Sequence, residues 1–139
     1  MDKKCLISGL VVGVLSLLLG FVVHGILLAA DYAKLGNLFR PQADQSATFP
    51  YMVIAHLVFG FAFAWIYREG KKAGVATLGQ GIRYGLAVAL LAIVPMYLIY
   101  YAVQPMPGGL VARQIIFDSI AMVLLGLVVA YMNRAPGEA

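Results

Sequence analysis

The chain has 139 residues, of which 63% are hydrophobic and only 12% are charged. A water-soluble domain carries about twice that share of charge, so the composition excludes an ordinary soluble globule and favours a protein that lies in lipid. The formal net charge of +4 comes from basic residues spread along the chain rather than gathered in one patch, which argues against nucleic acid as a partner.

Four apolar segments follow one another along the chain. A helix crosses a bilayer with about 17–25 apolar residues, and segments of this kind lie at residues 5–30, 51–67, 82–103 and 110–132. The more polar residues 31–50 are expected to form a loop on the outer side, ending in coil before the second span. The chain is therefore predicted to be a single all-α domain, an integral membrane four-helix bundle.

The long loop contains one amphipathic stretch. Tyr32, Leu35, Leu38 and Phe39 fall on one face of a short helix. Such a helix would either lie on the outer membrane surface or extend the first span beyond the lipid.

Basic residues indicate how the spans are oriented. With four spans, both termini and the second loop share one side of the membrane, which holds seven Lys and Arg residues against three on the other side. Positive residues concentrate on the cytoplasmic side of membrane proteins, so both termini are predicted to be cytoplasmic. The larger set comprises Lys3, Lys4, Arg68, Lys71, Lys72, Arg83 and Arg134, and the smaller set comprises Lys34, Arg40 and Arg113.

Small residues recur on one face of each span. Because lipid tails give helices no hydrophobic reason to associate, close backbone approach at such residues must supply the contact energy. The rows therefore predict close packing between the helices. They comprise Gly9, Gly13, Ser16 and Gly20 in the first span, Gly60 and Ala64 in the second, Gly81, Gly85, Ala89 and Ala92 in the third, and Ala112, Ser119, Gly126 and Ala130 in the fourth.

The second and fourth spans end alike. Residues 60–68 match residues 126–134 at glycine, alanine, aromatic and arginine positions, which indicates two duplicated helical hairpins. The first and third spans do not align convincingly, so the sequence supports the repeat only in part. Pro95 interrupts the third span, and because it lacks a backbone donor it is expected to kink the helix.

Polar side chains gather in the outer half of the spans. His24 and His56 are expected at similar depth, roughly 8 Å below the outer interface at about 1.5 Å per residue. Both lie on the small-residue faces of their helices, so they are predicted to face each other. Asp118 lies deeper in the same half, with Gln114 one turn before it and able to hydrogen-bond to it. The tyrosines expected beside these groups are Tyr97 and Tyr101.

Ionisable residues inside membrane spans mark functional sites by default, and four interpretations stay open. His24 and His56 fit the axial ligands of a haem b, with Gly20 and Gly60 leaving room for the porphyrin. Histidine and aspartate are also suitable metal ligands, although no short spacing motif supports a metal site. A third interpretation is a proton or solute relay through His24, His56 and Asp118. In the fourth, which we favour, hydrogen bonds among these groups hold the helices in register.

The sequence carries no motif for catalysis. A phosphate-binding glycine loop, a paired-histidine zinc motif, paired cysteines and a serine elbow are all missing. We therefore predict a protein that is not an enzyme and acts as an accessory, scaffold or assembly component of a membrane complex. Its expected partners are the lipid bilayer and either a larger complex or further copies of itself. The alternative is a small transporter or a b-type haem carrier built around His24, His56 and Asp118.

The segment 81–134 resembles small uncharacterised four-helix bacterial membrane proteins. The likeness rests on "YG" at the start of the third span, on "YA" before the turn "QPMPGG", and on Gly126 late in the fourth span. It implies a bacterial inner membrane as the location and implies no particular activity.

Overall fold

The structure, a computed structural model, describes residues 2–36 and 38–134, apart from the side chains of residues 42 and 43. Every regular element in these residues is helical. The elements are α1 (Lys3–Gly20), the π-helix η1 (Phe21–Leu27), α2 (Ala29–Tyr32), the 3₁₀-helix η2 (Ala33–Leu35), α3 (Gln42–Gly70), α4 (Thr77–Val88), the π-helix η3 (Ala89–Ile93), α5 (Val94–Val103) and α6 (Gly108–Met132).

Four helical stretches of these residues are long and apolar enough to cross a membrane, which confirms that part of the prediction. They are Lys3–Leu27, Asp44–Gly70, Thr77–Val103 and Gly108–Met132. The first, third and fourth correspond to the segments predicted from hydropathy. The second is much longer than predicted.

The helix of the second span begins early. α3 starts at Gln42, so the prediction that residues 31–50 form a loop is wrong for residues 42–50. Pro50 lies inside α3. It removes one backbone donor in the polar first turns of the helix. Because those first turns are polar, hydropathy alone does not assign them to the helix.

The residues after the first span fold back onto the helix ends. α2 and η2 together cover residues 29–35. Tyr32, Leu35 and Leu38 pack against a buried apolar cluster that includes Leu28 and Leu110. Three of the four residues on the apolar face of the amphipathic stretch are therefore partly covered by the protein itself, while Phe39 is 43% exposed.

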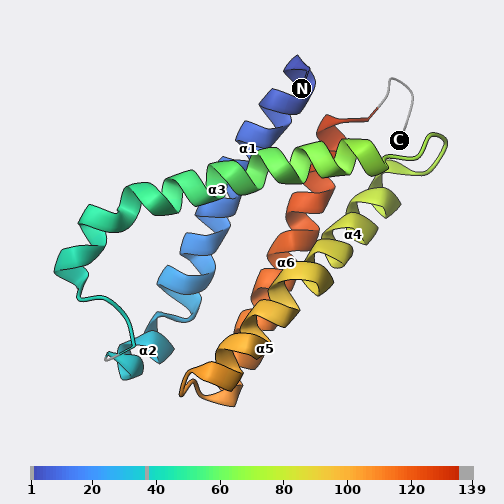
Figure 1. Cartoon of the computed structure of the whole chain (residues 1–139). Coiled ribbons are helices and arrows are strands. Elements are labelled where there is room, and N and C mark those ends of the chain that lie inside the picture. The colour runs from blue at the N-terminus through green and yellow to red at the C-terminus, as the bar shows by residue number, and fades with distance from the viewer. Residues whose placement is uncertain (1, 37, 135–139) are drawn as a thin grey trace.

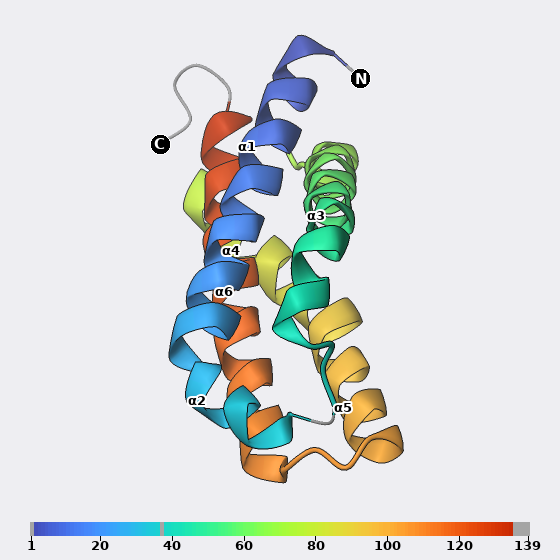
Figure 2. The same cartoon turned by 90° about the vertical axis from the view of Figure 1, so that its left-hand side faces the viewer.

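The four long helices form two close pairs (Figure 1). α1 packs mainly against α3, and α4 packs against α6, while α1 also contacts α6 and so joins the pairs. α3 crosses α1 steeply, whereas α4 and α5 run beside α6. Viewed from the side, α1 and α6 lie next to each other (Figure 2), and the start of α1 and the end of α6 lie at the same end of the molecule.

Glycines allow the helices of each pair to touch backbone to backbone. A Cβ atom at Gly60 would collide with backbone atoms of Gly9 and Gly13. A Cβ atom at Gly126 would collide with the backbone of Gly81 and Gly85. The small residues predicted to mediate packing therefore lie at close contacts within both pairs.

The two contacts share one local arrangement of glycines, although the helices cross at different angles. In each pair, one glycine of the second helix lies over two glycines of the first helix that are one turn apart. The carbonyl oxygen of His56 faces Gly13 as the carbonyl oxygen of Met122 faces Gly85. The structure thus aligns the first span with the third, which the sequence alone does not do convincingly. This shared arrangement is the one expected of a duplicated helical hairpin.

Asp2 ties the beginning of α1 to the end of α3. Its carboxylate caps α1 by accepting a hydrogen bond from the backbone N–H of Cys5 at 2.9 Å. It also accepts hydrogen bonds from both terminal nitrogens of the Arg68 guanidinium. Chiefly because of the Arg68 hydrogen bonds, the pKa of Asp2 is lowered from its usual 3.8 to about 2.

We expect Asp2→Asn to lower the melting temperature of the purified protein at neutral pH. Because the pKa of Asp2 is lower in the folded chain, the carboxylate stabilises the fold above its usual pKa of 3.8 and stops doing so as the pH falls to about 2. Thermal denaturation in mild detergent across this range should therefore bring the two proteins together at acidic pH. A difference that persists unchanged to the acidic end would contradict the assignment.

Candidate functional site

Five polar side chains meet where the two helix pairs join. η1 and α2 contribute one each, α5 contributes one, and α6 contributes two. We call them the polar cluster: His24, Tyr32, Tyr97, Gln114 and Asp118. The structure thus brings together four of the six residues predicted to form a site.

Asp118 is the centre of the polar cluster and is only 8% exposed. Its Oδ2 atom accepts a hydrogen bond from the Tyr97 hydroxyl at 2.5 Å and lies 3.3 Å from His24 Nε2. An ionised carboxylate can only accept hydrogen bonds, so the Tyr97 hydroxyl donates its proton to Asp118, and His24 Nε2 lies close enough for an electrostatic contact. Without such partners, burial of the charge would be strongly unfavourable.

Tyr32 connects the other side of the His24 ring to α6. Its hydroxyl oxygen lies 2.7 Å from His24 Nδ1 and accepts a hydrogen bond from Gln114 Nε2 at 2.9 Å. Burial raises the pKa of Tyr32 above its usual value, so the hydroxyl keeps its proton and can donate it to Nδ1. These roles assign the neutral His24 ring as protonated at Nε2, towards Asp118. Hydrogen bonds thus link Gln114, Tyr32 and His24, and the contact between His24 and Asp118 joins them to the Tyr97–Asp118 hydrogen bond.

Two π-helical segments lie next to the polar cluster. η1 carries His24, and η3 comes shortly before Tyr97. Pro95 is the second residue of α5, two residues after η3 ends, and has no N–H to donate to the preceding turn. The interruption predicted at Pro95 is therefore accompanied by a π turn, a feature that is frequent at functional sites.

His56 lies outside the polar cluster. Its Nδ1 atom lies 2.9 Å from Ser16 Oγ, and the Ser16 hydroxyl donates to the Gly13 carbonyl at 2.8 Å. Because that hydroxyl has a single proton, His56 is assigned as the donor at Nδ1. Its side chain therefore holds α3 against α1, within the first helix pair.

The two histidines are therefore engaged separately. Both ring nitrogens of His24 face protein partners, so iron ligation by His24 would have to displace Tyr32 or Asp118. In the part of the chain that the structure describes, no group of three His, Cys, Asp or Glu side chains is placed to hold a metal ion.

Two further details differ from the sequence-based hypothesis. Gln114 donates to Tyr32 rather than to Asp118, although the two α6 residues are one turn apart. Tyr101 is 52% exposed and takes no part in the polar cluster. Both differences arise because side-chain direction depends on the neighbouring helix as well as on spacing.

Tyr32 is the cluster residue that the sequence-based hypothesis missed. It lies two helical turns after His24, so same-face spacing was an available signal. Because the neighbouring residues are polar, Tyr32 was instead predicted to lie in the loop of residues 31–50. Beside it, Asp31 accepts a hydrogen bond from Arg113 at 2.9 Å, which adds a second, more exposed contact between α2 and α6.

Comparisons of the chain with protein-family models, with curated proteins and with solved structures found no match.

Proposed function

We propose that this chain is an integral protein of the bacterial inner membrane, with four spans and both termini in the cytoplasm. Support comes from the four long apolar helices and from the unequal distribution of Lys and Arg between the two ends. The start of α1 and the end of α6 lie at one end of the molecule (Figure 1), as an even number of spans requires.

Within the membrane, we assign the chain a non-enzymatic role as an accessory, scaffold or assembly component of a larger complex. The observation that carries this assignment is the uneven burial of the spans. In Asp44–Gly70 and Thr77–Val103, only 17% and 11% of the most apolar window is buried, against 33% and 39% in the other two spans. α3 and the α4–α5 stretch therefore leave large apolar side chains uncovered, such as Tyr51 at 73% and Leu91 at 80% exposure. A partner helix packed there would bury surface that the chain itself does not cover.

Site-specific photocrosslinking in the native membrane tests this role. A photoreactive residue at Ile54 or Val58 on α3 is compared with one at Ile116 or Ile120 on α6, which are similarly exposed. We expect one discrete adduct with a larger membrane protein from the α3 positions and none from the α6 positions. Adducts with lipid alone at all four positions would contradict the proposal. An adduct of twice the chain's own mass would assign the surface to a second copy instead.

The polar cluster favours a second candidate, a small proton-coupled carrier. The His24 side chain is 36% exposed although it pairs with the buried Asp118. Among the described residues, the side-chain oxygen of Gln114 is buried without a hydrogen-bond partner. If His24 takes a second proton at Nδ1, the Gln114 amide can turn over and accept the proton of Tyr32. The cluster therefore has a second complete arrangement of protons.

Proteoliposomes loaded with a pH-sensitive dye test this candidate. With a proton gradient imposed across the membrane, wild-type protein should speed proton entry, and His24→Gln should slow it several-fold. His56→Gln is the matched control, because His56 lies outside the polar cluster, and it should leave the rate unchanged. Equal rates for the wild type and His24→Gln would exclude the carrier.

A further inference from the structure

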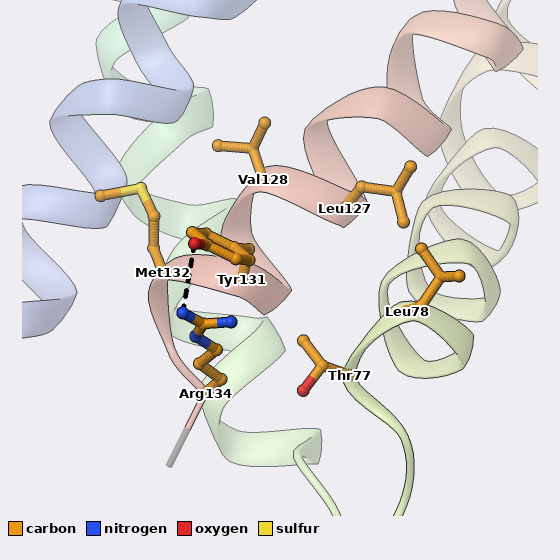
Figure 3. Close-up of a pocket in the computed structure, with 7 residues that line it drawn as sticks. All are labelled: Thr77, Leu78, Leu127, Val128, Tyr131, Met132 and Arg134. Carbon is orange, nitrogen blue, oxygen red and sulfur yellow. Dashed lines mark hydrogen bonds between the residues drawn. The ribbon is translucent and has the colours of Figure 1, made fainter. Parts of the chain in front are cut away.

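A cavity opens between the beginning of α4 and the end of α6, remote from the polar cluster (Figure 3). Its volume is about 550 Å³, within the range of small-molecule sites, roughly 300–1,000 Å³. Most of its wall is apolar and comes from Leu78, Leu127, Val128 and Met132. A wall of this kind fits a hydrocarbon chain.

One polar group in the wall lacks a partner. Thr77 lines the cavity and is only 7% exposed, and its hydroxyl has no hydrogen-bond partner within residues 2–36 and 38–134. A buried hydroxyl without a partner is energetically unfavourable. The hydroxyl oxygen itself is fully buried, but a rotation about χ1 would exchange it with the methyl group and allow it to meet a ligand oxygen, which would remove that penalty.

Thr77 is also the first residue of α4. The preceding residue, Ala76, provides no side-chain cap, and the first turn of α4 contains no acidic residue. The first backbone N–H groups of a helix point outwards and carry partial positive charge. The helix end therefore favours an anion beside the Thr77 hydroxyl.

Arg134 supplies a cation to the same cavity. Its guanidinium carbon lies 4.0 Å from the centre of the Tyr131 ring, and it donates a hydrogen bond to the Tyr131 hydroxyl at 3.1 Å. Figure 3 shows this pair facing the cavity, with Thr77 across from it and the apolar residues Leu127 and Val128 beyond. The ring thus holds the guanidinium in place instead of leaving it free in solvent.

Further cations gather at this end of the molecule. Lys4 donates to the Arg134 carbonyl at 2.9 Å, and Lys71 donates to the Asn133 carbonyl at 3.0 Å. Both ammonium groups therefore lie close to the two residues that follow α6. Positive charge around an apolar cavity attracts a ligand with an anionic head and an apolar tail.

We propose that this cavity binds one anionic phospholipid from the leaflet at this end of the protein. One acyl chain lies along Leu78, Leu127 and Val128, and the phosphate is held by the Thr77 hydroxyl, the first amides of α4 and Arg134. Lipid selection follows from charge, because a zwitterionic headgroup would bring a second cation close to Arg134. This site requires only that the chain lies in a bilayer, and it is independent of any protein partner.

Native mass spectrometry of the protein in mild detergent tests the site, with phosphatidylglycerol and phosphatidylcholine of identical acyl chains as probes. We expect the wild type to retain phosphatidylglycerol roughly fivefold better, the factor that one basic residue near a membrane surface provides. Arg134→Gln and Thr77→Val should each abolish most of this preference. Leu78 lies at an exposed edge of the cavity, and Leu78→Trp should fill its apolar part. This variant should therefore lower the retention of both lipids, which gives a second readout that does not depend on charge.

The matched control is Arg83→Gln. Arg83 is an exposed arginine of α4 that does not line the cavity, and its replacement removes the same charge. It should leave the preference unchanged. Equal retention of the two lipids by the wild type, or an equal loss in Arg83→Gln and Arg134→Gln, would overturn the proposal. Displacement of the phospholipid by an equal concentration of dodecanoate would assign the cavity to free fatty acids and overturn it as well.

Discussion

Replacing Gly60 or Gly126 with alanine is expected to destabilise the protein, by roughly 1–3 kcal/mol for each substitution. The added Cβ atom would collide with backbone atoms of the facing helix, at Gly9 and Gly13 in one pair and at Gly81 and Gly85 in the other. Backbone cannot move aside as a flexible side chain can, so the two helices must separate. Separation removes the close packing that holds helices together in lipid.

The chain offers a matched control for this experiment. Gly79 lies in α4 and has no atom within 4 Å of where a Cβ would be. Gly79→Ala should therefore stabilise the protein slightly, since alanine is more favourable than glycine in a helix by about 1 kcal/mol. Unfolding each of the three variants with increasing amounts of a denaturing detergent gives a midpoint for each, and the midpoints can be compared directly. Similar midpoints for Gly60→Ala, Gly126→Ala and Gly79→Ala would show that the glycine contacts do not hold the pairs together.

Asp118→Ala is expected to destabilise the protein by roughly 2 kcal/mol, because it leaves the Tyr97 hydroxyl and the His24 N–H without an acceptor. Single hydrogen bonds between membrane helices average only about 0.6 kcal/mol. Here, however, one charged group satisfies two donors in a buried position. The same unfolding titration measures the loss. A double-mutant cycle with His24→Ala then isolates the part that belongs to the His24–Asp118 pair.

Asp31→Asn is the control for Asp118. Asp31 also links α2 to α6, through Arg113, but the Arg113 side chain is 50% exposed and water screens the pair. Loss of the Asp31–Arg113 pair should change the free energy of unfolding by less than about 1 kcal/mol. A larger effect at Asp31 than at Asp118 would mean that the exposed pair, and not the polar cluster, joins the helix pairs.

Four of the five residues of the polar cluster could be predicted from the sequence, but the pairing between them and the fifth residue, Tyr32, could not. His24, Tyr97, Gln114 and Asp118 stand out because polar groups are rare in apolar runs, and helical rise places them at comparable depth. The partner of each group depends on the direction from which a second helix approaches. For that reason Gln114 meets Tyr32 rather than Asp118, and His56 meets Ser16 rather than His24.

The amino-acid sequence alone determines that this chain is helical and has four long apolar segments, because hydropathy and the spacing of small residues are local properties. It also marks the glycines at which helices approach. Only the tertiary structure decides that the helices associate as two pairs and that Tyr32 folds back onto His24 and Gln114. It also decides that an unpartnered hydroxyl lies in the wall of an apolar cavity near Arg134. These features depend on contacts between segments that are distant in the chain, and local patterns carry no information about such contacts.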